Sequence, residues 1–156
     1  MKNTVIVHGT DVEPIHMEHG KYEYVKRLIV PRQGNQCTVA LMELPPGKSA
    51  YPYHFHAGVT EVFYVTEGTG LVRTAEGAAE VGPGDMVICP PGPAGAHQMT
   101  NPSETETLRY VDFDTTSFVD APFYPDSGKF SVIIDGDGTG PFRLADEVDY
   151  FEGEPE

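Results

Sequence analysis

Short apolar runs separated by glycine- and proline-rich turns are the feature of this sequence that most limits its fold. The chain has 17 glycines and 14 prolines in 156 residues, and both residue types favour turns. The runs between the turns are rich in β-branched and aromatic residues, which favour strands. They are Tyr22–Val30, Gln36–Leu44, Glu61–Thr66, Leu71–Ala75, Met86–Cys89, Ala96–Thr100 and Leu108–Phe113. Since no helical period stands out among them, the pattern predicts an all-β sandwich or barrel.

The two ends of the chain are expected to extend this structure. Val5–Val7 is a candidate for a short edge strand, and Phe130–Ile134 for one more strand after Asp114. A length of 156 residues suits one core. We therefore expect a single domain over residues 1–156, with a C-terminal extension over about 115–156.

Three histidines and a glutamate are the residues with the clearest chemistry. Side chains alternate between the faces of a strand, so His54 and His56 should point the same way. Glu61 opens the following strand, and Gly58 permits a sharp turn between the two. If these strands pair as a hairpin, Glu61 approaches both histidines. His97 must then come from a distant strand, as a rolled sheet allows.

This set of side chains suits a metal. Three imidazoles and one carboxylate suit a divalent transition ion (iron, manganese, nickel, copper or zinc) and leave positions open for water or substrate. Any one of these histidines alone would more often be structural or solvated. We therefore base the prediction of a metal site on His54, His56, Glu61 and His97 together.

The same stretch resembles the two motifs of the cupin superfamily. The matching residues of the first motif are Gly47, His54, His56, Glu61 and Gly68, and those of the second are Gly84, Pro90, Gly92, His97 and Asn101. The matched core covers residues 47–101. It departs from the family pattern by one extra residue before His54 and by a longer spacer after Gly92, which carries Pro93 and Gly95.

The resemblance implies a fold and a range of functions. The expected fold is a double-stranded β-helix (jelly-roll) barrel with N- and C-terminal extensions. The expected function is that of a metal-dependent enzyme acting on a small oxygenated organic molecule, as a dioxygenase, isomerase or lyase. A non-catalytic module that binds a small molecule or sugar is the alternative, because fold does not imply function. A homodimer is the expected assembly.

Candidates for a substrate pocket follow from position along the strands. Phe63 lies two residues after Glu61 and Met99 two residues after His97, so each should point to the same face of its strand as that ligand. Tyr51 and Tyr53 lie just before His54. The alternative is that these are ordinary barrel core residues. Two arginines in predicted strands, Arg73 and Arg109, would bind a carboxylate or phosphate if they point inward, and would be solvated if they point outward.

Charge and hydropathy limit the partners. The formal net charge of -14 disfavours nucleic acid and anionic membranes, because binding phosphates needs a basic surface. Part of this acidity lies in residues 146–156, which should be a solvated end. The sequence shows neither a membrane-spanning apolar segment nor the apolar region of a secretory signal, so we expect a cytoplasmic protein with a small-molecule ligand.

Three further patterns have ordinary explanations. Cys37 and Cys89 lack metal-type spacing and should be free thiols. The stretch Asp135–Asp146 resembles a calcium loop, yet it lacks the flanking helices of that motif, so we interpret it as a polar turn. His16 and His19 are expected to be exposed loop residues rather than a second metal site.

Overall fold

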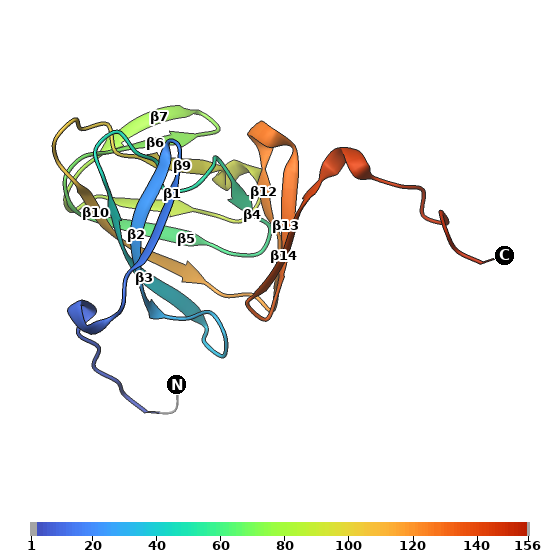
Figure 1. Ribbon diagram of the computed structural model, residues 1–156, viewed down its shortest axis with the longest axis horizontal. Coiled ribbons are helices and arrows are strands. Elements are labelled where there is room, and N and C mark those ends of the chain that lie inside the picture. Colours follow the sequence, from blue (N-terminus) through green and yellow to red (C-terminus); the bar gives the residue numbers. More distant parts are fainter. Residues whose placement is uncertain (1–2, 156) are drawn as a thin grey trace.

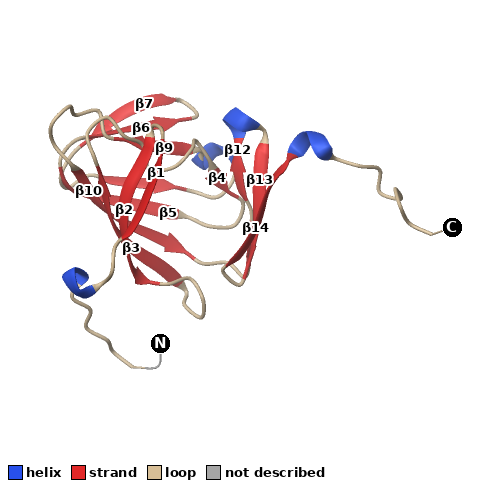
Figure 2. Cartoon of the chain, viewed as in Figure 1, coloured by secondary structure: helices blue, strands red, loops and turns tan. Residues whose placement is uncertain are grey.

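The computed structural model describes residues 3–155, and its regular elements are strands and short 3-10 turns (Figures 1 and 2). The strands are β1 (Ile15–His19), β2 (Tyr22–Val30), β3 (Cys37–Leu44), β4 (Phe55–His56), β5 (Glu61–Glu67), β6 (Gly70–Thr74), β7 (Gly77–Val81), β8 (Met86–Cys89), β9 (His97–Thr100), β10 (Leu108–Thr115), β11 (Val119–Asp120), β12 (Pro122–Tyr124), β13 (Lys129–Ile134) and β14 (Asp137–Arg143). The turns are η1 (Gly9–Asp11), η2 (Pro93–Gly95), η3 (Pro125–Ser127) and η4 (Leu144–Asp146).

The strands form three antiparallel sheets around one interior. The largest sheet runs β1-β2-β3-β10-β5-β8. A second sheet runs β7-β6-β9, and a third runs β11-β13-β12-β4 with β14 beside β13. An isolated bridge between His54 and His97 ties the chain before β4 to β9, so the smaller sheets meet along one side of the interior. This is the double-stranded β-helix expected from the sequence.

Alternation along the strands builds the core. On β3 every second residue is buried, including Met42 and Leu44, and the facing residues of β10 include Leu108 and Tyr110. Burying one large apolar side chain contributes about 1.5–3 kcal/mol. The cluster also contains Phe63, Val65, Val72 and Met99. The core fills the interior on one side of the histidines, and the other side remains open.

Most of the predicted strands are confirmed, and the structure adds strands that the sequence did not predict, β1, β7, β11, β12 and β14 among them. Val5–Val7 is not a strand: its residues are exposed and pair with no neighbour among the described residues. Gly77–Val81, which has few β-branched residues, was not predicted and forms β7 by pairing with β6. The strands of His56 and Glu61 do not pair with each other as a hairpin. β4 pairs with β12, and β5 lies between β10 and β8.

The strand Met86–Cys89 is only partly buried. It is a strand, as predicted, but only Cys89 is buried, while Met86 and Ile88 are 59% and 64% exposed. Because β8 lies at the edge of its sheet and alternate side chains leave opposite faces, Met86 and Ile88 point outward.

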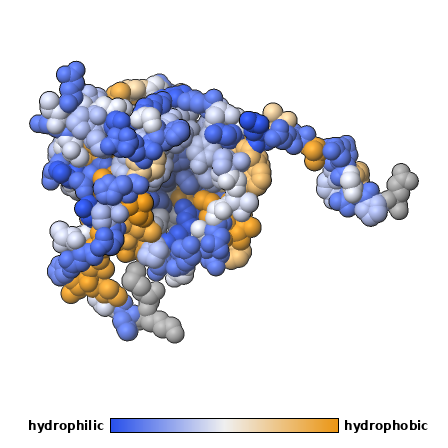
Figure 3. All heavy atoms as spheres, in the orientation of Figure 1, coloured by the Kyte–Doolittle hydropathy of each residue, from blue (hydrophilic) through white to orange (hydrophobic). Residues whose placement is uncertain are grey.

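The ends of the chain lie away from the barrel interior. His16 and His19 are exposed as expected, although they lie on strand β1 rather than in a loop. Asp135 and Gly136 form the turn between β13 and β14, so the calcium-like stretch is a β-hairpin. Residues 137–155 are exposed, and the last part of the chain leaves the body as a mostly hydrophilic arm (Figure 3). Glu156 lies outside the described residues. No helix within residues 3–155 is long and apolar enough to cross a membrane.

Candidate metal centre

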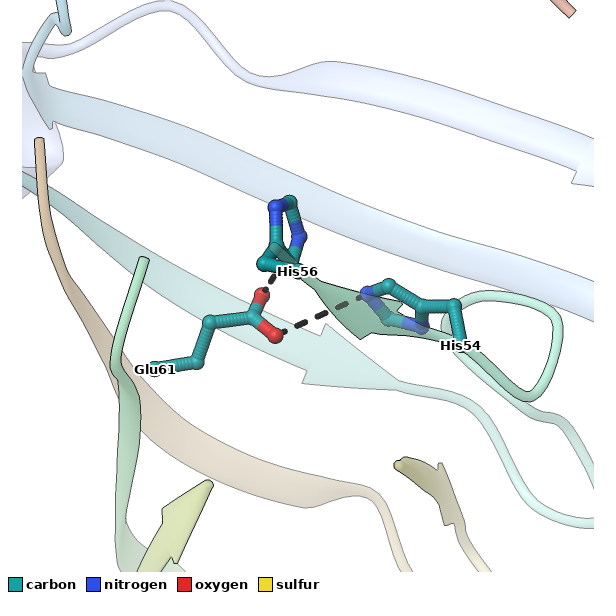
Figure 4. Close-up of side chains that lie close together, drawn as sticks. All are labelled: His54, His56 and Glu61. Atoms are coloured by element: carbon teal, nitrogen blue, oxygen red, sulfur yellow. Dashed lines mark ion pairs between the residues drawn. The ribbon is translucent and has the colours of Figure 1, made fainter. Parts of the chain in front are cut away.

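The carboxylate of Glu61 lies between two histidine rings (Figure 4). His54 Nε2 is 3.7 Å from Glu61 Oε2, and His56 Nε2 is 3.4 Å from Glu61 Oε1. One possible ligand atom from each of these three residues lies within 4.8 Å of the others. All three residues are less than 10% exposed. The structure therefore brings together three of the four predicted ligands as one buried group.

His97, the fourth predicted ligand, approaches the same carboxylate. Its Nε2 atom lies 3.3 Å from Glu61 Oε2, yet this buried nitrogen has no hydrogen-bond partner among residues 3–155. A buried polar atom without a partner is costly in free energy. An ion bound between the histidines and Glu61 would provide that partner.

Backbone hydrogen bonds to His54 fix the position of His97. The His54 N–H donates to the His97 carbonyl at 3.0 Å, and the His97 N–H donates to the His54 carbonyl at 2.8 Å. The long spacer after Gly92 is taken up by η2, so His97 begins β9 directly opposite His54. A Cβ atom on Gly95 would lie 1.8 Å from the Pro90 carbonyl oxygen. Only glycine fits at position 95 of this turn, which explains why Gly95 stands in the longer spacer.

In all three histidine rings, Nδ1 is hydrogen-bonded to a neighbouring oxygen and Nε2 faces Glu61. Each Nδ1 atom faces an oxygen that accepts a hydrogen bond: the Pro52 carbonyl for His54, the Gly95 carbonyl for His97, both at 2.9 Å, and Asp120 Oδ2 for His56, at 2.5 Å. A proton on Nδ1 leaves the Nε2 lone pair free toward Glu61. Partners of this kind fix the tautomer and orientation of metal-binding histidines.

Asp120 is one of the residues of the site that the sequence did not reveal. It lies on β11, is 1% exposed, and its other carboxylate oxygen accepts the Gly58 N–H at 3.0 Å. Arg32 Nη1 lies 3.7 Å from Asp120 Oδ2. A lone aspartate far from both motifs carries no recognisable signal, so only the fold shows that it holds His56.

The protonation of the cluster reflects these contacts. Burial lowers the pKa of His56, but hydrogen bonds to Asp120 and Glu61 outweigh it and raise the pKa to about 10. Burial raises the pKa of Glu61, and the His54 and His56 contacts more than reverse this, so the pKa lies well below its usual value. Burial lowers the pKa of His97. Without an ion, Glu61 is therefore ionised and His56 carries the compensating proton.

These observations fit a divalent transition ion. Three imidazole nitrogens and a carboxylate converge, their outer partners fix the rings, and one nitrogen lacks a partner within the described chain. Mixed nitrogen and oxygen sets of this type suit iron, manganese, nickel, copper or zinc, and the donor set does not select among them.

A cavity of about 200 Å³ opens beside the candidate metal centre. At about 30 Å³ per water in the liquid, it has room for only a small molecule. It is lined by Lys26, Arg32, Tyr51, His54, His56, Glu61, Asp112, Asp114, Pro122, Tyr124 and Ile133. The last part of the chain thus contributes β12 and β13 to the wall of the site.

Three of the four residues predicted to line a substrate pocket lie elsewhere. Phe63 and Met99 belong to the hydrophobic core, where Phe63 packs against His97 with ring centres 5.2 Å apart. Tyr53 is buried beneath Arg73, whose guanidinium lies 3.9 Å from the ring centre. None of the three is among the residues that line the cavity, whereas the neighbouring Tyr51 is.

Two aspartates on β10 form the acidic wall of the cavity. Asp112 and Asp114 are 5% and 7% exposed, and the Oδ1 atom of each has no hydrogen-bond partner within the described part of the chain. Burial raises the pKa of both carboxyls, and the charge of Asp112 adds to the rise at Asp114, whose pKa reaches about 9. At neutral pH Asp114 is therefore a neutral acid that faces the cavity.

Basic residues complete the wall. Lys26 Nζ lies 3.9 Å from Asp112 Oδ2 and donates a hydrogen bond to the Tyr51 hydroxyl at 3.4 Å. The sequence did not decide whether Arg73 and Arg109 point inward or outward. In the structure both point outward. Arg73 pairs with Asp126, and Arg109 pairs with Glu43 and Glu67, so neither reaches the cavity.

The two cysteines are free, as expected. Cys89 is buried beside the site on β8, opposite Glu61 on β5. Burial and then the charge of Glu61 raise the pKa of its thiol to about 12. A thiol that remains protonated is a poor nucleophile, and Cys89 packs in the hydrophobic core cluster.

The fold and the site together define a β-barrel protein with a buried histidine and carboxylate group at its open end. Residues 40–114 match the family model described as Cupin domain. Over these residues the chain carries a cupin domain. No protein of curated function matches it in sequence.

Solved structures share this fold at low sequence identity. A putative sugar phosphate isomerase from Acidithiobacillus ferrooxidans is 24% identical, with a TM-score of 0.75 and 90% of each chain covered. A sugar phosphate isomerase of the cupin superfamily from Silicibacter pomeroyi is 19% identical, with a TM-score of 0.78, over 91% of this chain and 94% of that one. A predicted oxalate decarboxylase from Thermotoga maritima is 23% identical, with a TM-score of 0.65, over 72% of this chain and 100% of that one.

Proposed function

We propose that this cupin is a metal-dependent enzyme that moves protons on a small oxygenated organic molecule, in an isomerase or lyase type of reaction. The observation that carries the proposal is the arrangement of His54, His56 and His97. Each ring is tied through Nδ1 and presents Nε2 to Glu61 beside an open cavity. Such an arrangement is suited to holding an ion while leaving room for a ligand.

The four side chains that would hold the ion are His54, His56, Glu61 and His97. When bound, a divalent ion supplies Lewis acidity that polarises a carbonyl or hydroxyl oxygen of the substrate. The ring orientations are set beforehand by Pro52, Gly95 and Asp120, so the protein needs little rearrangement to bind the ion.

Asp112 and Asp114 favour proton transfer over oxygen chemistry. Both residues line the cavity, one oxygen of each lacks a hydrogen-bond partner within the described chain, and Asp114 is a neutral acid at neutral pH while Lys26 supports a charge on Asp112. One carboxylate accepts a proton from a carbon beside the polarised carbonyl, and the neighbouring acid returns a proton to the product. Acid and base groups of this kind work best with pKa values shifted toward the working pH.

The substrate class follows from the size and lining of the cavity. A space of about 200 Å³ that includes Lys26, Arg32 and two tyrosine hydroxyls suits a small hydroxy-carbonyl compound with an acidic group. Sugar phosphates are one such class, and two proteins of the same fold are described as sugar phosphate isomerases.

The first test is elemental analysis of the purified protein alongside a His54→Ala, His97→Ala double variant. We expect near-stoichiometric metal in the native protein and none in the variant. His16→Ala with His19→Ala is the matched control, because these histidines are exposed and distant in sequence. Metal-free native protein that gains no thermal stability from added divalent ions would overturn the metal site.

The second test measures the reaction. The metal-loaded protein is incubated with a panel of hydroxy-carbonyl compounds and sugar phosphates in D₂O, and deuterium incorporation at carbon is followed by NMR. We expect incorporation or isomer formation that Asp114→Asn abolishes without loss of metal. Consumption of O₂ instead would place the protein among the dioxygenases.

A binding module is the second candidate, favoured by the presence of Tyr51 and Tyr124 in the cavity wall. Tyrosine hydroxyls hydrogen-bond sugars whether or not a reaction follows. Calorimetric binding of a compound from the same panel, with no deuterium incorporation and with equal affinity after metal removal, would favour this function over catalysis.

A further inference from the structure

Arg32 is a cation in the wall of the site cavity that has an unused hydrogen-bond donor. It follows β2, on the loop that leads to β3, and it lines the cavity beside the candidate metal centre. Its side chain is 16% exposed, and its buried Nη1 atom has no hydrogen-bond partner among residues 3–155. A buried donor without a partner is costly in free energy. An oxygen atom of a ligand in the cavity would supply that partner.

Asp120 attracts Arg32 without satisfying this donor. Arg32 Nη1 lies 3.7 Å from Asp120 Oδ2, which is beyond the usual hydrogen-bond distance of about 3.2 Å. Asp120 Oδ2 faces His56 Nδ1 at 2.5 Å, and the other oxygen accepts the Gly58 N–H at 3.0 Å. Both carboxylate oxygens of Asp120 are therefore engaged by other groups, and the guanidinium is held nearby by charge alone.

Lys26, the other cation that lines the cavity, already has partners. Its Nζ atom donates to the Tyr51 hydroxyl at 3.4 Å and lies 3.9 Å from Asp112 Oδ2. Lys26 therefore serves the acidic wall of the cavity. Of these two cations, Arg32 is the one whose nitrogen lacks a partner within the described chain.

Arg32 also lines a second cavity, of about 190 Å³, formed by the loops that follow β2, β10 and β13. Among the described residues, neither Lys26 nor any of the four candidate metal ligands lines this second cavity. Arg32 is therefore part of a wall that the two cavities share, and it stands at the border of the site cavity.

We propose that Arg32 is the specificity-determining residue of the site cavity, and that it binds the oxyanion of the substrate, a carboxylate or a phosphate monoester. This inference rests on the proposed function, because it names the group of the substrate that the same cavity recognises. A planar guanidinium matches two oxygens of either group and forms two parallel hydrogen bonds with them.

The selectivity comes from the cost of an unpaired donor. A neutral compound of the same shape would leave Arg32 Nη1 without a partner, so it should bind more weakly than the acid. A site built to pair with a polar group discriminates strongly against analogues that lack the group. Arg32 would hold one end of the substrate while Asp112 and Asp114 act on the rest of the molecule.

Ligand pairs that differ in the acidic group test this role. Glycolate is compared with glycolamide, and glycerol 3-phosphate with glycerol, by NMR titration of the zinc-loaded protein. We expect Arg32→Gln to weaken binding of the acids by about 10- to 100-fold and to leave the neutral partners unchanged. The acid that loses more affinity shows whether the site takes a carboxylate or a phosphate. Arg73→Gln is the matched control, because Arg73 pairs with Asp126 on the surface.

The same titration of metal-free protein separates this inference from the proposed function. Arg32 is not one of the four candidate metal ligands, so its effect on the acids should persist without an ion and without any turnover. Arg32→Lys keeps the charge and guards against a general loss of structure. It should bind the acids more tightly than the glutamine variant and less tightly than the native protein. Native protein that binds both members of each pair equally, or an Arg32→Gln variant that weakens both members equally, would overturn the proposal.

Discussion

The Nδ1 atom of His56 and the Oδ2 atom of Asp120 lie 2.5 Å apart, although the two residues are 64 positions apart in the sequence. The contact links β4, which carries the motif histidine, to β11, which lies in the C-terminal part of the chain. The part of the chain after residue 114 thus helps to build the candidate metal centre, because it supplies the anion that orients His56.

Asp120→Asn should weaken metal binding by about 10- to 100-fold, the usual effect of losing a partner of a metal-bound histidine. The amide removes the charge that holds the His56 ring with its proton on Nδ1. Competition with a chromogenic chelator measures the affinity. Asp126→Asn is the control, since Asp126 pairs with Arg73 on the surface. Equal affinities for both variants would remove Asp120 from the site.

Metal binding should release a proton and strengthen as the pH rises. In the metal-free protein the pKa of His56 is about 10, above its ordinary value of 6.5. The ion must displace that proton, so the affinity should rise by about tenfold per pH unit between roughly 6.5 and 10 for one proton. Calorimetry at pH 8 in buffers of different ionisation enthalpy counts the protons released. A count of zero would contradict the assigned protonation.

The same raised pKa gives the metal-free protein a pH-dependent stability. Because the folded pKa of His56 is above the unfolded one, its contribution is complete below pH 6.5 and is lost as the pH rises through 10. Chemical unfolding of metal-free protein from pH 6 to 10 should show this loss, and His56→Gln should reduce it. A slope that is unchanged in the variant would assign the loss to other groups.

Asp114→Asn should stabilise the protein while reducing any turnover. The pKa of Asp114 rises from 3.8 to about 9 on folding, first through burial, so stability falls as the pH rises between these values. A neutral amide removes that cost, and we expect a gain of about 1–3 kcal/mol near neutral pH. Urea unfolding at pH 5 and pH 8 should show a larger gain at pH 8. Asp137→Asn, on exposed β14, should show no gain.

Gly95→Ala should destabilise the protein by about 3 kcal/mol or more and should lower its metal content. The new Cβ would lie 1.8 Å from the Pro90 carbonyl oxygen, so η2 must shift and take His97 with it. Gly82→Ala is the control, because a Cβ there meets no atom within 4 Å among the described residues. Thermal unfolding with elemental analysis measures both effects. Unchanged stability would show that the turn can rearrange.

The sequence predicted the barrel because its strands alternate regularly and its turns use glycine and proline. Tyr22–Val30 and Cys37–Leu44 were found almost residue for residue, since β-branched runs end at clear breakers. It also predicted the convergence of His54, His56 and Glu61. The convergence does not come from a hairpin, however. β4 and β5 belong to different sheets, and His54, His56 and Glu61 meet only when the barrel closes.

The parts that the sequence did not predict depend on contacts between distant segments. Asp120, Asp112 and Lys26 reach the site from β11, β10 and β2, and nothing local distinguishes them from other strand residues. The alternation of side chains along a strand correctly predicts that Phe63 and Met99 point inward. It does not distinguish a residue of the hydrophobic core from one that lines the cavity. That difference arises only from how the sheets close on one side of His97.

Side chains on β5 alternate between two different environments, so the pairing register of this strand cannot shift. Glu61 faces the three histidines, and Val62 lies on the other face, where its paired neighbours are Phe113 and Ile88. A shift of one residue would exchange the two faces, placing a valine among the imidazoles and a carboxylate among apolar side chains. Insertion or deletion of one residue between Val59 and Val65 should therefore damage the metal centre and the outer surface in one step.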